Sequence, residues 1–264
     1  MARFGRNEQL VIAGAAVALV AYLIGVVTQD WSIRPNGLSI MIGSLVALAI
    51  AFTGVGRSLA GYPGGTLLRI AAALVGAFAY IDLGDLISSF SDWETITIVL
   101  TVVYVGGAAV LAYGAWAASG GNLVSDLTGV RGVMRLSMID RLVYLGAAGV
   151  LVGWFLLMAI ADIFTFTAES QIAVLAAVLV LVVRWLDRNP SAGRIPIAAP
   201  WATAGLAAVA VLLGAWWFIR VIGRTLEVGD LTTYVPLVIY LVALAVLAAG
   251  AFLGMGTKAP QPAA

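Results

Sequence analysis

The sequence is dominated by eight apolar runs, each close to the length that crosses a lipid bilayer. The hydrocarbon core of a bilayer is about 30 Å thick, and a helix needs roughly 20 apolar residues to span it. The runs lie at residues 10–27, 38–55, 67–87, 96–118, 142–161, 172–186, 202–222 and 234–255. They lack the strict alternation of polar and apolar residues that membrane β-strands need. The pattern therefore predicts an all-α polytopic membrane protein of about eight transmembrane helices.

The composition leads to the same conclusion. Of the 264 residues, 62% are apolar and 10% are charged, whereas soluble domains carry roughly 25% charged residues. A water-soluble fold of this length could not bury so much apolar surface, so we expect the lipid bilayer to be the main partner of the chain. The net charge of +1 gives no reason to expect a nucleic-acid partner.

The basic residues predict the orientation, because short cytoplasmic loops of membrane proteins are enriched in Lys and Arg. If the N-terminus is cytoplasmic, eleven of the 14 basic residues fall on the inner side, and Arg34, Arg220 and Arg224 fall outside. Nine of the 13 acidic residues then fall outside. We therefore predict a multi-pass protein of the cell membrane with both termini in the cytoplasm. The shortest run, 172–186, is expected to rely on snorkelling by Arg184.

The two halves of the chain resemble each other. A shift of 132 residues places residues 8–30 on residues 140–162 and Gly14 on Gly146. With small further shifts, residues 74–81 match residues 212–219, and residues 104–116 match residues 240–252. Three of four helix pairs thus align in order, which predicts two tandem four-helix repeats. Each half holds an even number of spans, so the repeats would be parallel, related by a pseudo-two-fold axis along the membrane normal.

The repeat gives a domain organisation with four parts. Residues 1–118 form the first four-helix repeat, residues 119–140 a cytoplasmic linker, residues 141–256 the second repeat, and residues 257–264 a disordered tail. Within the linker, apolar residues recur at helical spacing, which is typical of an amphipathic helix on the inner leaflet. Two glycines weaken that pattern, so an irregular linker is the other interpretation.

Small residues in the apolar runs predict close helix packing, which lipid-embedded helices depend on. Gly146, Gly149 and Gly153 lie along one side of the fifth predicted helix, and Gly250 and Gly254 repeat this spacing in the eighth. Such glycines can form seams within one chain or the face of a homodimer. With eight helices to pack, we favour seams.

Four ionisable residues in or near the apolar runs are the candidate site: Asp82, Asp85, Arg220 and Arg224. Ionisable residues inside a membrane are costly and are often functional. The repeat alignment places Asp82 opposite Arg220, so one predicted position holds an acid in the first half and a base in the second. Three interpretations are open: the four charges snorkel to the outer surface, they form an ion pair between the repeats, or they line a path for an ion or solute.

Missing residue types exclude several chemistries. The chain contains no His and no Cys, which excludes a His-ligated haem, a Ser-His-Asp triad and a Cys/His zinc site. Its one Lys, Lys258, lies in the tail. The spacing of Asp82 and Asp85 could hold Mg²⁺, but metal-dependent transfer would need further acids nearby. We therefore expect no enzymatic activity, no cofactor and no metal site.

Two functional classes remain. The first is a permease or channel for a small solute or ion, favoured by the duplication and by the Asp82/Arg220 position. The second is a non-catalytic structural or accessory subunit of a membrane complex, favoured by the scarcity of polar groups and implying other membrane subunits as partners.

Overall fold

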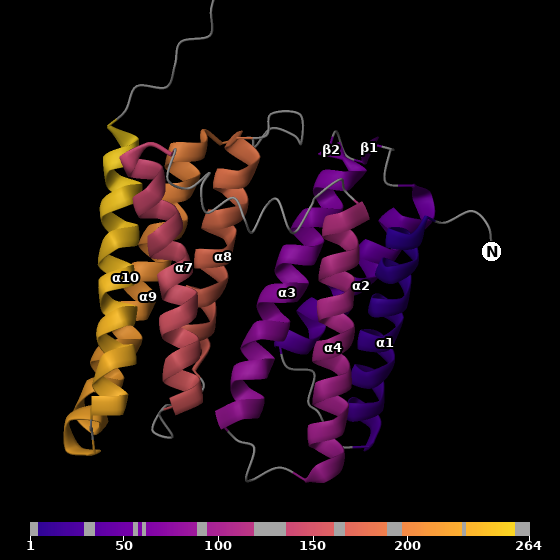
Figure 1. Cartoon of the computed structure of the whole chain (residues 1–264), viewed down its shortest axis with the longest axis horizontal. Helices are drawn as coiled ribbons and strands as arrows, with labels where there is room; N and C mark the ends of the chain where they lie inside the picture. Colours follow the sequence, from indigo (N-terminus) through magenta and orange to yellow (C-terminus); the bar gives the residue numbers. More distant parts are fainter. Residues whose placement is uncertain are drawn as a thin grey trace, which may run out of the picture. The chain divides into compact units, whose positions relative to one another are not determined.

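The computed structural model describes residues 5–28, 35–54, 58–59, 62–88, 94–118, 136–160, 167–188, 197–228 and 231–256. Within these ranges the chain forms eight α-helices and one short β-hairpin (Figure 1). Each predicted apolar run coincides with one helix, which confirms the all-helical class. The chain divides into two compact units, and each is described by itself.

Unit 1 contains the first four helices and the hairpin. Its elements are α1 (Arg6–Thr28), α2 (Pro35–Thr53), β1 (Ser58–Leu59), β2 (Tyr62–Pro63), α3 (Gly64–Ser88) and α4 (Thr95–Ala118). The two strands are antiparallel, with Ser58 opposite Pro63 and Leu59 opposite Tyr62. The helices close into a ring in which each contacts the next and α4 returns to α1. The contact between α1 and α4 is the most extensive in the unit.

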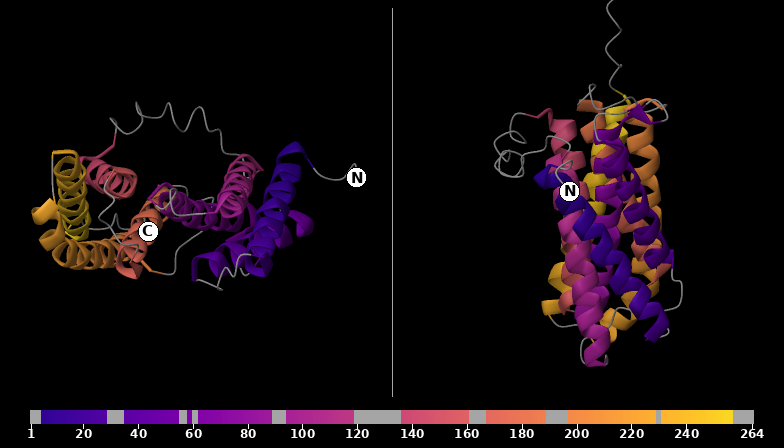
Figure 2. Two further views of the ribbon diagram at one scale, coloured as in Figure 1. Left: turned by 90° about the horizontal axis from the view of Figure 1, so that it is seen from below. Right: turned by 90° about the vertical axis from the view of Figure 1, so that its right-hand side faces the viewer.

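Unit 2 repeats this arrangement of neighbours. Its helices are α7 (Met138–Ile160), α8 (Ala168–Arg188), α9 (Ala199–Val228) and α10 (Leu231–Met255). Here too each helix contacts the next, and the first and last helices, α7 and α10, share the most extensive contact. The left view of Figure 2 looks along the helices of each unit. We call the end of each unit at which its first helix begins its predicted cytoplasmic end.

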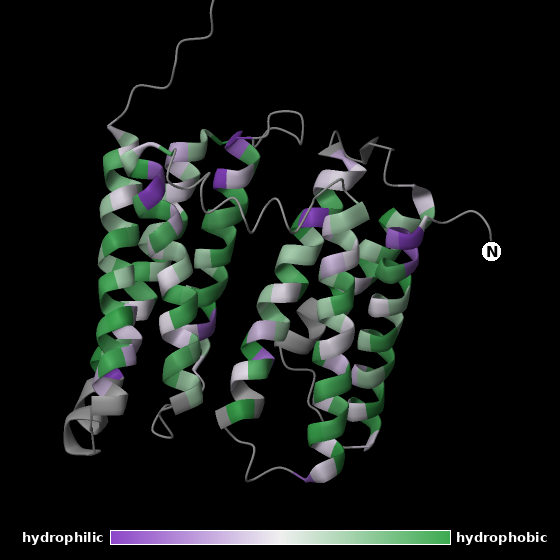
Figure 3. Cartoon of the chain, in the orientation of Figure 1, coloured by the Kyte–Doolittle hydropathy of each residue, from purple (hydrophilic) through white to green (hydrophobic). Residues whose placement is uncertain are grey.

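The helices are long and apolar enough for a multi-pass membrane protein. Among the described residues, seven helices meet the length and hydropathy needed to cross a bilayer, and the apolar part of α2, Met41–Thr53, is shorter. Figure 3 shows apolar residues along the helices. Large apolar side chains are exposed on the helix surfaces: Val20 is 56% exposed, Leu212 69% and Val242 55%. Helices that are apolar on all sides belong in lipid.

Small residues form the contact between the first and last helix of each unit. A Cβ atom on Gly114 of α4 would lie 2.8 Å from the backbone nitrogen of Val11 in α1. In unit 2, a Cβ on Gly250 of α10 would lie 2.7 Å from the backbone nitrogen of Val143 in α7. No side chain fits at these distances, so glycine is required for the helices to approach. This confirms the predicted seam within the chain for Gly250, whereas Gly114 was not among the predicted glycines.

Some helix boundaries differ from the predicted ones. α9 continues six residues beyond the predicted end at residue 222, through Arg224, and α10 begins at Leu231 and remains helical through Pro236. The apolar runs stop at polar residues, but backbone hydrogen bonds continue a helix regardless of side-chain polarity. The short hairpin was not predicted. Residues 119–135 of the predicted linker and the predicted tail, 257–264, lie outside the described residues, and α7 already begins at Met138.

Candidate functional site: polar groups within the two helical units

Asp82 lies on α3, and its carboxylate is hydrogen-bonded inside unit 1. The Tyr104 hydroxyl on α4 donates to Asp82 Oδ2 at 2.7 Å. The Tyr104 side chain is 2% exposed, so the bond is formed at the packed contact between α3 and α4. Burial of a carboxylate is costly unless donors meet it, and Tyr104 is such a donor.

A second tyrosine joins this pair from a third helix. Tyr22 on α1 is 7% exposed, and its ring centroid lies 6.0 Å from that of Tyr104, with the rings tilted by 37°. Aromatic rings at this separation attract each other beyond simple burial. We call Asp82, Tyr104 and Tyr22 the Tyr–Asp cluster, which three helices of unit 1 build together.

Arg220 lies near the end of the described side chains of α9 and is bound within unit 2. Its Nη1 donates to Glu169 Oε1 of α8 at 2.7 Å. The Arg220 side chain is 58% exposed, as expected of a surface ion pair. Asp85 and Arg224 lie on α3 and α9, and their side chains are outside the described part of the structure.

The predicted pair between Asp82 and Arg220 stays a prediction, because the two residues belong to separate units. Each of them nevertheless has a partner inside its own unit, Tyr104 for Asp82 and Glu169 for Arg220. An ion pair between the repeats is therefore not needed to explain how either charge is stabilised.

The corresponding region of unit 2 is aromatic. Tyr240 on α10 aligns with Tyr104 and is fully buried. Its ring contacts Trp217 edge to face, with centroids 5.5 Å apart and an interplanar angle of 78°. A Cβ on Gly214 would lie 2.6 Å from the Tyr240 hydroxyl oxygen. Among the described residues, that hydroxyl has no hydrogen-bond partner, in contrast to Tyr104.

The predicted cytoplasmic end of unit 2 carries a charged cluster, formed by Asp140, Arg184, Asp187 and Arg188. Asp140 lies in the first turn of α7, where Ser137 caps the helix: the Asp140 backbone N–H donates to Ser137 Oγ at 3.1 Å. The Asp140 carboxylate pairs with Arg184, and with Arg188 at 2.8 Å. Arg184 also lies 3.5 Å from Asp187. The four formal charges cancel.

The sequence suggested that Arg184 snorkels to the headgroups. In the structure it is instead paired within unit 2. Its side chain is only 12% exposed, because α7 supplies a carboxylate beside it and the side chain has no need to reach the headgroups. Arg188 is more exposed, and its guanidinium lies 5.1 Å from the centre of the Tyr144 ring. In unit 1, Arg69 makes a similar contact with Trp116, also at 5.1 Å.

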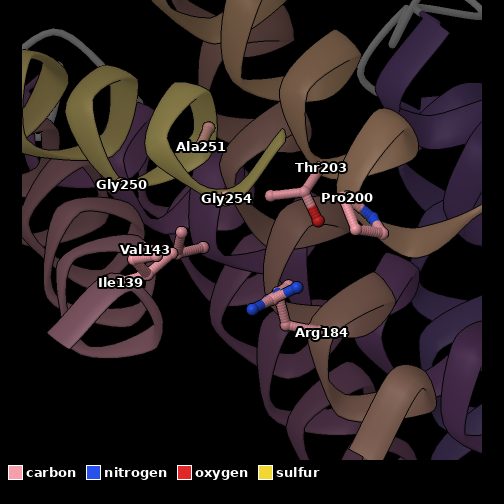
Figure 4. Close-up of a pocket in the computed structure, with 8 residues that line it drawn as sticks. All are labelled: Ile139, Val143, Arg184, Pro200, Thr203, Gly250, Ala251 and Gly254. Atoms are coloured by element: carbon pink, nitrogen blue, oxygen red, sulfur yellow. The ribbon is translucent and has the colours of Figure 1, made fainter. Parts of the chain in front are cut away.

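A small pocket adjoins Arg184 in unit 2. It has about 10 Å³ of room for the centre of a water molecule, and Figure 4 shows its lining. Arg184 and Thr203 face it from α8 and α9, and Gly250 and Gly254 line it from α10. Its volume excludes an organic solute.

Within the described residues, no group of three or more acidic side chains could hold a metal ion. The arrangement instead offers one carboxylate with phenol groups in unit 1, and one balanced charge cluster in unit 2. The first can accept a proton or contact a cation, and the second ties helix ends together.

Sequence reasoning found Asp82 and Arg220 but missed their partners, Tyr104 and Glu169. Tyr104 could have been found, because it lies within an apolar run and a buried tyrosine hydroxyl usually has a polar partner. Comparison of the chain with protein-family models, curated proteins and solved structures finds no match, so the site is interpreted from its geometry alone.

Proposed function

We propose that this integral membrane protein is a permease or channel for a small solute or ion, and that Asp82 is a polar point on the path. The supporting observation is the hydrogen bond from Tyr104 to Asp82 at 2.7 Å within the helices of unit 1. An ionisable residue inside a membrane span is a candidate functional group because its presence there is costly.

The depth of the Tyr–Asp cluster supports this proposal. Asp82 lies six residues before the end of α3, or about 9 Å of helix rise, and Tyr104 lies nine residues into α4, or about 13–14 Å. Both therefore fall inside a hydrocarbon core of about 30 Å. A residue that only reached for the headgroups would have no need of a buried phenol as its partner.

We also propose that the two units are tandem copies arranged as parallel repeats. The close approaches support this: Gly114 meets Val11 in unit 1, and Gly250 meets Val143 in unit 2. A shift of 132 residues places Val11 on Val143, and a shift of 136 residues places Gly114 on Gly250. The alignment of the two halves therefore maps one contact onto the other. Parallel repeats of this kind occur in secondary transporters, with substrate sites near the repeat interface.

The protein would lie in the cell membrane with both termini in the cytoplasm and eight spans, α2 included. The charged cluster at the predicted cytoplasmic end of unit 2 supports this orientation, since two arginines are stably placed there. The proposal includes no enzymatic activity, no cofactor and no nucleic-acid partner.

Flux into proteoliposomes tests the function. Purified protein would be reconstituted and assayed with protons, K⁺ and Cl⁻ as ionic probes, and with glycerol and urea as neutral probes. We expect at least one probe to cross faster than in protein-free vesicles and Asp82→Asn to reduce that flux. The control, Asp187→Asn, changes an acid of unit 2 that is 44% exposed and should leave the flux unchanged. Failure of every probe to exceed protein-free leakage would contradict the proposal.

The second candidate is a non-catalytic structural or accessory subunit of a membrane complex. Close packing favours it: Gly146 and Gly153 of α7 press against Leu247 and Tyr240 of α10, leaving no space along this seam. Affinity purification from the native membrane in mild detergent separates the two candidates. A stoichiometric membrane partner, together with no flux by the chain alone, would favour the accessory subunit.

A further inference from the structure

The Tyr–Asp cluster of unit 1 holds a carboxylate among apolar helices, and its position allows exchange of a small ion. Tyr22 and Tyr104 lie in the same cluster of buried side chains as Ala108. The Tyr104 side chain is 2% exposed, whereas Asp82 is half-buried. The carboxylate is therefore held by a buried partner on one side and remains partly accessible itself.

The oxygen atoms of the cluster are too few for a metal cation. Ca²⁺ and Mg²⁺ are surrounded by six or more oxygen atoms, and K⁺ sites in channels use rings of backbone carbonyls, which an α-helix bonds internally. The cluster offers one carboxylate and two phenol groups. Elsewhere in the described chain, too, no group of three or more acidic side chains could hold a metal ion. A proton needs only one lone pair, which a single carboxylate oxygen supplies.

The bond from Tyr104 is compatible with both charge states of Asp82. The Tyr104 hydroxyl donates to Asp82 Oδ2 at 2.7 Å. When a proton adds to Oδ1, the group changes from –COO⁻ to neutral –COOH, and Oδ2 becomes the carbonyl oxygen, which still accepts the bond from Tyr104. Release of the proton restores the carboxylate. The same packing therefore serves both forms.

The ionisable groups around Asp82 are mostly phenols or lie at the other end of the unit. Besides Asp82, the described residues of unit 1 include these ionisable ones: Arg6, Glu8, Tyr22, Tyr62, Arg69, Tyr80, Asp85, Glu94, Tyr104 and Tyr113. Helix α2, which packs against α3, contributes none. Both arginines lie toward the predicted cytoplasmic end, and Arg69 precedes Asp82 by about 20 Å of helix rise. Tyr80, two residues before Asp82, lies on a different side of α3, and the Asp85 side chain is outside the described part of the structure.

Unit 2 has no such carboxylate at the aligned position. Arg220, which matches Asp82 in the repeat alignment, pairs with Glu169, and an arginine does not release its proton in proteins. Tyr240, which matches Tyr104, packs against an aromatic ring. We propose that Asp82 reversibly binds a proton and that H⁺ is the ion that the protein carries, a role that rests on the proposed transport function.

Infrared difference spectroscopy of the reconstituted protein tests the proton site. As the pH is lowered from about 9 to about 4, a range that covers perturbed carboxyl groups, we expect a C=O stretching band of a protonated carboxyl that is present in the wild type and missing in Asp82→Asn. Tyr104→Phe should move this band to higher frequency, because Oδ2 loses its hydrogen bond. The matched control is Tyr113→Phe, which removes a hydroxyl of a 50% exposed residue of the same helix and should leave the band in place.

Proton flux into proteoliposomes separates failure of this proposal from failure of the proposed function. We expect H⁺ to cross faster than in protein-free vesicles, Asp82→Asn to reduce this flux to the protein-free rate, and Asp187→Asn to leave it unchanged. Absence of a band that depends on Asp82 would overturn the proposal even if another probe crosses, and so would flux of K⁺ or Cl⁻ without flux of H⁺. A band without any flux would contradict transport, including that of H⁺, while proton binding by Asp82 would stand. If Asp82→Asn does not fold, the band shift in Tyr104→Phe still assigns the carboxyl.

Discussion

Tyr104 and Tyr240 occupy aligned positions in the two units, yet their hydroxyl groups meet different surroundings. The Tyr104 hydroxyl donates to Asp82, whereas among the described residues the Tyr240 hydroxyl, beside Gly214, has no hydrogen-bond partner. The two tyrosines therefore form an internal comparison, since the same substitution removes a bonded hydroxyl in one unit and an unbonded one in the other.

We predict different outcomes for the two phenylalanine substitutions. Tyr104→Phe should lower the free energy of unfolding by about 1–3 kcal/mol, because the Asp82 carboxylate loses a buried donor. Tyr240→Phe should change it by less than about 0.5 kcal/mol or raise it, because an unsatisfied polar atom is removed. Unfolding in mixed detergent micelles measures both values. Equal losses would show that the Tyr104 hydroxyl contributes no bond of its own.

The charged cluster at the start of α7 gives a second prediction at this scale. Asp140→Asn should destabilise the protein by about 3 kcal/mol, because it leaves the largely buried Arg184 without its main partner. Asp187→Asn is the matched control. Asp187 is 44% exposed and 3.5 Å from Arg184, so its removal should cost less than about 1 kcal/mol. Comparable losses from the two substitutions in thermal unfolding would argue against the buried pair.

At the scale of elements, the seams between first and last helices depend on glycine. Gly114→Ala and Gly250→Ala each place a Cβ within 2.8 Å of a backbone nitrogen on the facing helix. We expect each substitution to cost about 1–3 kcal/mol, because the helices must separate to admit a methyl group.

The controls for this prediction are two helical glycines that do not face a neighbouring helix. A Cβ on Gly106 of α4 or on Gly205 of α9 meets nothing within 4 Å. Gly106→Ala and Gly205→Ala should therefore be neutral or stabilising by up to about 1 kcal/mol, since alanine favours the helix. The free energy of unfolding in micelles is again the measurement. Seam substitutions as mild as these controls would contradict the packing described.

The helices could be predicted from the sequence, but the side-chain partners could not. Each apolar run became a helix because a chain in lipid must satisfy its backbone hydrogen bonds internally. The helices are apolar on every side, so the sequence does not reveal which face packs inward. Tyr104 and Tyr113 lie on the same helix, yet one is 2% and the other 50% exposed. Tyr104 can bond to Asp82 because it lies on the face of α4 that packs inward.

The same reason explains the wrong expectation for Arg184. Its own helix gave no partner except Asp187, so snorkelling was the natural inference. The carboxylate that holds it, Asp140, comes from α7 and is 44 residues earlier in the chain. Contacts between distant segments are set by helix packing, which an evenly apolar sequence does not encode in a readable pattern.

At the scale of the whole molecule, the proposed pair of parallel repeats depends on how many times the chain crosses the bilayer. Seven described helices clearly have the length and hydropathy of spans, and α2 has a shorter apolar segment, Met41–Thr53. If α2 also crosses, the number of spans is even and both termini lie on one side. If it does not, the termini lie on opposite sides and two parallel four-helix repeats are impossible.

Labelling of single cysteines in intact cells tests this claim most directly, because the native chain contains no Cys. The variants are Gly5→Cys before α1, Glu94→Cys before α4 and Gly256→Cys after α10. With a membrane-impermeant maleimide, we predict labelling of Glu94→Cys in intact cells, and labelling of the other two only after permeabilisation. Labelling of only one of the two terminal cysteines in intact cells would contradict eight spans, and labelling of both would contradict the orientation.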